Sequence, residues 1–393
     1  MITRSVLFAI CSLLSIAPAR SEEPREIAIG YVDLADDPYY GETKGYAGLY
    51  TVDRRSPYPA AELAIQDSRA IGAALGVTFA LVRKTLRSGE DVTAAVRTMI
   101  QQQHIIAAVI DLPRDQTEKS ANALASEPLP LFNARHEDPA LRPSTCRSRL
   151  FHTIPSQDML TDALAQALLA RNWSRVLVLE GQAPEDIAFS RSFQGSATKF
   201  GLTVSEIRPF VLGNDPRQRD QNNVRLLTGG VTYDTVFVAD EGRQFAPYVP
   251  YNTFDPRPVI GSEGLIASAW HPFWERQGAP QLNRRFFRRN GRVMSDEDWA
   301  TWAALRALVD AIVRMHGAGD RPLDQALLDP QSTIELYKGY QGSFRPWNRQ
   351  LRQPILLGTA DAVVGLAPVE GVLHEKNTLD SLGLDEPEFK CPQ

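Results

Sequence analysis

The strongest constraint on the fold is a regular alternation of short apolar runs with helix-forming stretches, which begins at Ile27. The apolar runs carry β-branched residues and show no polar alternation, a pattern typical of strands that are buried on both faces. Helical stretches separate these runs, and this order predicts a parallel sheet with helices on both of its faces. In the first half we predict strands at 27–32, 77–82, 105–110 and 129–132, and helices at 59–76, 92–103 and 115–126.

The same alternation begins again after Phe151 to Pro155, which predicts a second unit of the same kind. Because crossovers between parallel strands are right-handed, most of the topology follows from the order of the elements. We therefore expect an α/β protein with two lobes, each a parallel sheet flanked by helices. The second unit has predicted strands at 175–179, 204–211 and 235–239, and predicted helices at 159–171, 187–200 and 222–227.

A further segment, residues 295–316, has the pattern of a long amphipathic helix. Ser295 and Asp298 have the spacing of a capping box, in which each side chain binds the backbone N–H of the other residue. The helix has a wide apolar face, which indicates packing in a core and not a cofactor site. Since the second unit is already complete, we expect this helix to pack against the first. The face consists of Trp299, Trp302, Leu305, Leu308, Val309, Ile312 and Val313, and strands are predicted after it at 354–357 and 362–366.

The N-terminal residues have the pattern of a secretory signal peptide. Arg4 gives a short basic start, residues 6–16 are almost wholly apolar, and Ala17-Pro18-Ala19 has the small residues of a cleavage site. We therefore expect residues 1–19 to be removed and the remaining chain to be exported. No later stretch reaches the roughly 20 apolar residues that a helix needs to cross a bilayer, so we expect no direct membrane insertion. The exported chain is mildly acidic, which disfavours nucleic acid as a partner.

Two cysteines, Cys146 and Cys391, follow the signal segment. In an oxidising compartment a lone pair of cysteines usually forms a disulfide, and no CxxC motif or Cys/His cluster points to a metal. The disulfide would tie the C-terminal tail to a point more than a third of the way along the chain. Two free buried thiols are the alternative.

Acidic residues follow two buried strands of the second half. Asp240 and Glu241 come directly after the predicted strand that precedes them, and Glu263 follows a second apolar run at 258–261. In open α/β sheets, ligands bind in the crevice beyond the carboxyl ends of the strands. With Trp270 nearby, these acids predict one wall of a ligand-binding cleft. The alternative is that the acids cap the elements that follow them.

Polar and aromatic side chains also follow strands of the first half, and they predict the second wall. A tyrosine ring provides a flat apolar surface and a hydroxyl group at low entropic cost, which suits a loop that closes over a small ligand. The tyrosines could instead belong to a surface loop that packs on itself, and the arginine could be a counter-ion for nearby acids. The candidate residues of this wall are Asp33, Tyr39, Tyr40, Asp111, Asn133 and Arg135.

Motifs for catalysis are missing from the sequence. It contains neither G-x-S-x-G nor HExxH, and no GxGxxG follows the first strand. Neither of the two later cysteines has a neighbouring histidine that could activate it. We therefore predict a protein without enzymatic activity, without a cofactor and without a dedicated metal site.

With this architecture, the chain resembles the type I periplasmic binding proteins of the branched-chain amino-acid class. Residues 59–64 resemble the first helix of that family, and residues 260–264 resemble its glutamate-bearing strand end. The resemblance implies two α/β lobes joined by several hinge crossings, with a ligand trapped when the lobes close. It also implies that Glu263 is placed to bind a ligand ammonium group.

The lobes are expected to be discontinuous in the sequence. We expect an N-terminal lobe of residues 24–154 plus 295–342 and a C-terminal lobe of residues 155–294 plus 343–372. The tail, residues 373–393, is expected to be tied back to the N-terminal lobe.

Longer strings are similar to the substrate-binding component of the ABC transporters that are found with PQQ-dependent alcohol dehydrogenase systems. The similarity implies a periplasmic protein that binds a small molecule, has an ABC transporter permease as its partner and is encoded beside alcohol-oxidation functions. The strings are residues 146–156, 251–258, 344–348 and 350–354.

Two ligand classes stay open at this point. One is a small organic solute with an amine or several hydroxyl groups, held by Glu263, Asp240 and Asn133 and stacked on tyrosines. The other is a hard cation such as Ca²⁺ or a lanthanide ion, because acids cluster at the strand ends and such ions prefer oxygen ligands. A ligand sensor or docking subunit without a role in transport is a further alternative.

Overall fold

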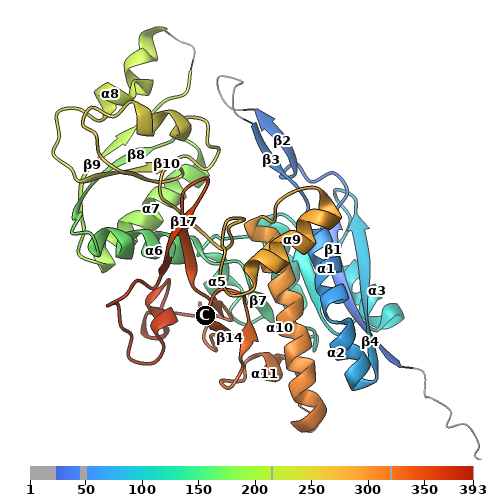
Figure 1. Cartoon of the computed structure of the whole chain (residues 1–393). Helices are drawn as coiled ribbons and strands as arrows, with labels where there is room; N and C mark the ends of the chain where they lie inside the picture. The colour runs from blue at the N-terminus through green and yellow to red at the C-terminus, as the bar shows by residue number, and fades with distance from the viewer. Residues whose placement is uncertain (1–23, 45–50, 214–215, 319–320, 393) are drawn as a thin grey trace, which may run out of the picture.

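The structure of the protein is a computed structural model that describes residues 24–44, 51–213, 216–318 and 321–392. These residues form two α/β lobes that lie side by side, together with smaller antiparallel sheets (Figure 1). The expected signal segment, residues 1–19, lies outside the described residues.

The first lobe is built on a five-stranded parallel sheet with the strand order β4-β1-β5-β6-β7, which confirms the predicted alternation. The short strand β7 was not predicted. The predicted helix at 59–76 is divided into two helices at Ser68, whose Oγ donates to the carbonyl oxygen of Ala64 at 2.7 Å. The elements are β1 (Arg25–Leu34), α1 (Tyr58–Asp67), α2 (Arg69–Leu75), β4 (Val77–Leu86), α3 (Val92–Gln103), β5 (Ala108–Asp111), α4 (Arg114–Ala123), β6 (Leu131–Asn133), α5 (Leu141–Ser144) and β7 (Leu150–His152).

The second lobe is built on a four-stranded parallel sheet with the order β11-β10-β8-β9. Its first helix begins after Ser156, whose Oγ accepts a hydrogen bond from the N–H of Met159 at 3.3 Å. The elements are α6 (Gln157–Leu169), β8 (Arg175–Glu180), α7 (Pro184–Lys199), β9 (Thr203–Pro209), the 3₁₀ helix η1 (Pro216–Asn222), α8 (Val224–Leu227), β10 (Thr235–Ala239), the 3₁₀ helix η2 (Ala246–Tyr251) and β11 (Val259–Gly261).

Connections between the lobes are hydrogen-bonded to each other. His152, at the end of the first sheet, forms a parallel bridge with Gln350, and the Nε2 of Gln350 donates to the carbonyl oxygen of Ile154 at 2.9 Å. The Nε2 of Gln353 donates to the carbonyl oxygen of Thr153 at 2.8 Å. Two chain crossings therefore run together at the base of the two lobes, as expected for a hinge.

The antiparallel elements that the structure describes form three small sheets outside the two parallel sheets. One sheet has the order β12-β16-β17, a second has the order β13-β14-β15, and the β2-β3 hairpin projects from the first lobe (Figure 1). Their bounds are β2 (Gly41–Lys44), β3 (Thr51–Arg54), β12 (Ile266–Ser268), β13 (Ile334–Glu335), β14 (Gln341–Phe344), β15 (Leu351–Arg352), β16 (Ile355–Gly358) and β17 (Val363–Ala367).

The long helix α10 (Asp296–Ala318) packs on the first lobe, as predicted (Figure 1). Its capping box is present, because Asp298 N–H donates to Ser295 Oγ at 3.2 Å and Ser295 N–H donates to Asp298 Oδ2 at 2.9 Å. Trp299 and Trp302 are fully buried in the core of this lobe, so the apolar face serves packing.

The segment before α10 also belongs to this core. We expected the chain to return to the first lobe at residue 295, yet Trp270 and Trp274 already lie in the first-lobe cluster. Helix α9 (Ala279–Asn290) adds Leu282 and Phe286 to the same cluster, and α11 (Leu323–Leu327) follows α10. The cause is apolar burial, since these large side chains are covered by the first-lobe core.

The C-terminal tail contacts both lobes. It contains the 3₁₀ helices η3 (Thr378–Ser381) and η4 (Glu386–Glu388), and Leu382 between them belongs to the second-lobe core. Lys199 Nζ in that lobe donates to the carbonyl oxygen of Gly383 at 2.9 Å. The chain then reaches the first lobe, where Cys391 forms the predicted disulfide with Cys146, with 5.8 Å between their Cα atoms.

Candidate ligand-binding site

A cleft of about 870 Å³ lies between the lobes, where the carboxyl ends of both parallel sheets face each other. The first lobe contributes the loop after β6, the hairpin region and the first residues of α10. The second lobe contributes the first residues of α7 and the loop after β10. The lining side chains include Tyr39, Arg54, Arg135, His136, Glu137, Asp138, Gln157, Glu185, Ala188, Glu241, Arg243, Asp296 and Glu297.

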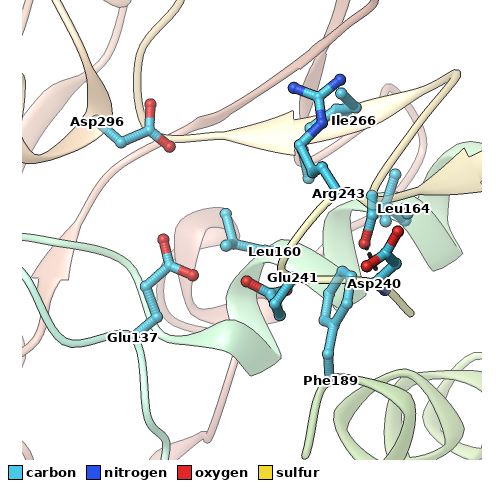
Figure 2. Close-up of a pocket in the computed structure, with 12 residues that line it drawn as sticks. Glu137, Leu160, Leu164, Phe189, Asp240, Glu241, Arg243, Ile266 and Asp296 are labelled. Atoms are coloured by element: carbon cyan, nitrogen blue, oxygen red, sulfur yellow. Dashed lines mark hydrogen bonds between the residues drawn. The ribbon is translucent and has the colours of Figure 1, made fainter. Parts of the chain in front are cut away.

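A smaller inner pocket of about 160 Å³ shares Glu137, Glu241, Arg243 and Asp296 with this cleft. Its deeper walls are apolar and come from α6, α7 and β12. Figure 2 shows the acidic side chains at the junction of the two cavities and the apolar side chains beside them. The apolar walls include Leu160, Leu164, Phe189 and Ile266.

Arg135 is the centre of the first-lobe wall. Its Nη1 donates to Asp37 Oδ2 at 2.6 Å and to Asp111 Oδ1 at 3.4 Å. The guanidinium group lies 4.1 Å from the ring centroid of Tyr39 and 5.2 Å from that of Tyr40. Arg135 therefore lines the cleft with a positive charge that buried carboxylates already compensate, which is the counter-ion role considered above.

Asp111 lies behind this wall and lines neither of the two cavities. It accepts hydrogen bonds from the hydroxyl groups of Tyr31 at 2.8 Å and of Tyr40 at 2.5 Å. Burial raises the pKa of Asp111 to about 6, although the hydrogen bond from Tyr40 and the charge of Arg135 lower it. Asp111 thus holds the tyrosine loop and Arg135 in place.

Asn133 shapes the loop that carries the cleft residues after β6. Its Oδ1 accepts hydrogen bonds from the N–H groups of Arg135 at 3.1 Å and of His136 at 2.8 Å. Asn133 is fully buried, and burial lowers the pKa of the His136 imidazole to about 4, which keeps that side chain neutral. Asn133 therefore positions this loop and does not line either cavity.

The acids after β10 have different roles. Asp240 Oδ2 accepts hydrogen bonds from the N–H groups of Phe245 at 2.6 Å and of Ala246 at 2.7 Å, so it caps η2 and also lines the inner pocket. The main-chain N–H of Glu241 donates to Asp186 Oδ1 at 2.7 Å. The side chain of Glu241 lines both cavities. Burial and the charge of Asp186 raise the pKa of Glu241 to about 7.

Like Asp111 and Asn133, three further predicted site residues lie away from the linings of these two cavities. Asp33 pairs with Arg83, whose Nη2 is 2.5 Å from Asp33 Oδ2. Glu263 pairs with Arg243 at 2.6 Å. Trp270 lies in the first-lobe core, where its Nε1 donates to Asn283 Oδ1 at 2.8 Å and its ring stacks on that of Trp299.

Several residues that line the cleft were not among the predicted site residues, above all Glu137, Asp296 and Glu297. Asp296 accepts hydrogen bonds from the N–H groups of Ala269 at 3.0 Å and of Trp270 at 2.8 Å, and burial raises its pKa to about 6. Glu137 could have been predicted from the rule that ligands bind beyond strand ends, because it follows Asn133 and Arg135 in the same loop. Asp296 and Glu297 begin a helix, where acids are ordinary, so their sequence position carried no signal of a binding site.

Within residues 24–44, 51–213, 216–318 and 321–392, no three His, Cys, Asp or Glu side chains come together in a way that could hold a metal ion. Among the helices of these ranges, none combines the length and the apolar character that crossing a lipid bilayer requires.

Solved structures with the same arrangement of lobes match nearly the whole chain. A branched-chain amino-acid ABC transporter periplasmic ligand-binding protein from Burkholderia xenovorans has a TM-score of 0.65 at 13% identity, over 86% of this chain and 95% of its own. The chain has the type I periplasmic binding protein fold.

Other structures of this fold were solved with different ligands. A Desulfitobacterium hafniense ABC transporter substrate-binding protein in complex with Leu has a TM-score of 0.63 at 18% identity, over 86% of this chain and 99% of its own. An ABC transporter solute-binding protein from R. palustris in complex with benzoate has a TM-score of 0.60 at 12% identity, over 87% and 96%. No protein-family model and no curated protein sequence matches the chain. At these identities the comparison establishes the fold and not the ligand.

Proposed function

We propose that the protein is the periplasmic solute-binding component of an ABC transporter and that it traps a small ligand between its lobes for delivery to the transporter permease. The observation that carries the proposal is the cleft at the facing carboxyl ends of two parallel sheets, above paired hinge crossings. Its volume of about 870 Å³ falls within the range of small-molecule sites. Solved proteins of this fold include periplasmic ligand-binding proteins of ABC transporters.

Lobe closure supplies the two states that such a protein needs. The ligand favours the closed state because it contacts both walls only when the lobes are together. The expected moving bodies are residues 24–154 plus 295–342 and residues 155–294 plus 343–372. We assign 269–294 to the first body instead, because side chains of this segment pack in the first-lobe core.

We also propose a link to PQQ-dependent alcohol oxidation. It is supported by the similarity of residues 146–156, 251–258, 344–348 and 350–354 to the corresponding component of such systems. Growth of a deletion strain on alcohols tests this link, because unchanged growth on every alcohol that the parent strain oxidises would contradict it.

Ligand-dependent closure tests the main proposal. Protein recovered from the periplasm is unfolded to release bound small molecules, which are identified by mass spectrometry, and the refolded chain is measured by small-angle scattering with and without the released fraction. We expect the radius of gyration to decrease when that fraction is added.

Ala188→Trp is the matched control, because Ala188 is an exposed residue that lines the cleft and a large ring there blocks closure. The radius of gyration of this variant should not decrease when the released fraction is added. A wild-type protein that releases no small molecule and keeps the same radius of gyration with the released fraction would contradict the proposed function.

A further inference from the structure

The acids around the junction of the cleft and the inner pocket are not equivalent. Asp240 caps η2, Asp296 accepts two backbone hydrogen bonds, and Glu297 Oε1 accepts a hydrogen bond from the hydroxyl group of Tyr39 at 2.7 Å. Among the described residues, the side chains of Glu137 and Glu241 have no hydrogen-bond or ion-pair partner. No group in the described part of the chain therefore binds either of these two carboxylates.

Glu137 and Glu241 come from opposite walls and meet at one place. Glu137 belongs to the loop after β6 in the first lobe, and Glu241 follows β10 in the second. Both side chains line both cavities, and Figure 2 shows their carboxylates directed toward a shared space, with Asp296 across it. Burial, followed by the charge of Glu241, raises the pKa of Glu137 well above its usual value.

Within the residues that the structure describes, no nearby arginine forms an ion pair with Glu137 or Glu241, although the charge of Arg142 lowers the pKa of Glu137 and that of Arg54 lowers the pKa of Glu241. Arg243 pairs with Glu263 at 2.6 Å, and Arg135 pairs with Asp37 at 2.6 Å. Arg142 is buried, and its Nη2 donates to Gln350 Oε1 at 2.9 Å. Two routes then remain to neutralise the junction: proton uptake, which the raised pKa values of Glu137 and Glu241 favour, or a cationic ligand that binds both carboxylates.

The inner pocket adds an independent requirement. Beyond the two glutamates its walls are Leu160, Leu164 and Phe189, all of them buried side chains. Its volume of about 160 Å³ is small compared with that of the cleft. Because an apolar cavity of this kind favours apolar groups, it suits a short hydrocarbon chain attached to the charged group.

We propose that the cleft selects a primary amine with a short apolar chain, whose ammonium group lies between Glu137 and Glu241 and whose chain enters the inner pocket. The proposal rests on the proposed function, since it names the ligand class of the same cleft. An ammonium group has three donors, so it can bind both glutamates and retain one donor for Asp296 or water. A neutral alcohol leaves the two charges uncompensated, and a carboxylate adds a like charge.

The test is a charge series on one carbon skeleton. Isothermal titration of the full exported chain compares 3-methylbutylamine, 3-methylbutanol, 3-methylbutanoate and leucine, and the butyl series of amine, alcohol and acid repeats the comparison with a straight chain. We expect the amine to bind roughly 10- to 100-fold more tightly than the alcohol of the same skeleton, since charge-assisted hydrogen bonds are lost in the alcohol.

Two variants assign the effect to the named residues. Glu137→Gln and Glu241→Gln should each weaken amine binding by about tenfold or more, and neither should weaken alcohol binding, because each removes a charge that the alcohol cannot compensate. Glu370→Gln is the matched control, because Glu370 is an exposed glutamate of the second lobe that lines neither cavity. Equal amine affinity in all three variants would overturn the assignment to Glu137 and Glu241.

The outcomes separate this inference from the proposed function. Binding of the alcohol, the acid or leucine without binding of the amines would overturn the amine assignment and leave the solute-binding function in place. If none of the compounds binds, the amine assignment is also overturned. The closure experiment with the released fraction then decides the proposed function by itself.

Discussion

Replacing Glu241 by Gln should stabilise the ligand-free protein, although it removes a side chain from the proposed binding site. Glu241 lies beyond β10, is largely removed from water and has no side-chain partner among the described residues. Its carboxylate is therefore a largely buried charge that no hydrogen bond or ion pair from the described residues stabilises, which is unfavourable in the folded state. The titratable and charged groups that face it are Asp186, Asp240, Glu185 and Glu137, which are acidic, and Arg54, which is basic.

The size and pH range of the effect follow from linkage. The pKa of Glu241 rises from 4.5 to about 7 because of burial and the neighbouring acids. Between these values the folded protein keeps a proton that the unfolded chain has released, so stability is lost as the pH rises through this interval. At roughly 1.4 kcal/mol per pH unit, the ionised side chain costs at most about 3.5 kcal/mol above pH 7.

Urea unfolding followed by tryptophan fluorescence measures this difference. We expect wild type and Glu241→Gln to have similar free energies of unfolding near about pH 4.5, and the variant to be more stable by roughly 2–3 kcal/mol near about pH 8. Glu370→Gln, which changes an exposed carboxylate, should show no such dependence. A difference that is the same across this pH range, or a less stable variant at the upper end, would refute the reasoning.

Three further changes test the scaffold. Cys391→Ser opens a disulfide with a sequence separation of 245 residues, and we expect a loss of roughly 2–4 kcal/mol in urea unfolding that reductant reproduces in wild type but not in the variant. Arg135→Met removes the cation that pairs with the buried Asp37 and Asp111, so its free energy of unfolding should fall by roughly 3–5 kcal/mol, and an unchanged melting temperature would argue against that pairing. Gly383→Ala places a Cβ 2.6 Å from Met159 Cγ at a φ of +75°, and a loss of roughly 1–3 kcal/mol in the same assay is expected. Gly371→Ala, which has a φ of +92° and open space, is its control and should lose less.

The parallel sheets were predictable because each longer strand has an apolar sequence pattern that can be recognised without knowledge of its neighbours. The run at 235–239 is β10 with the predicted bounds, and the predicted helix at 92–103 is α3. Strand β7 has only three residues, which is too short for a periodic signal. Helix α9 was missed because its exposed arginines dominate the sequence while only a few apolar residues, such as Leu282 and Phe286, are buried.

The binding site was predictable only in part, because the approach of two lobes is not a local property of the sequence. The rule that ligands lie beyond strand ends led to Arg135 and Glu241, and the structure places both in the lining of one cleft. The same rule could not show that Glu263 has an arginine partner or that Asp240 caps a 3₁₀ helix, since these roles depend on where the chain turns next. Trp270 follows these acids closely in sequence, yet the chain has already turned into the first-lobe core at that point.

The positions of Glu137 and Glu241 make the energy of the proposed lobe closure depend on the charge between them. In the proposed lobe closure, Glu137 would move with the first lobe and Glu241 with the second, so closing an empty cleft would bring two like charges together or require proton uptake, which their raised pKa values favour. This repulsion is strongest in the closed state, where the effective dielectric constant is lowest, and it therefore favours the open state when no ligand is bound. A cationic ligand reverses the sign of the interaction, and a neutral or anionic solute of the same shape does not. The differential stabilisation that closure requires is then supplied by the charge of the ligand, which makes the conformational change itself a test of ligand class.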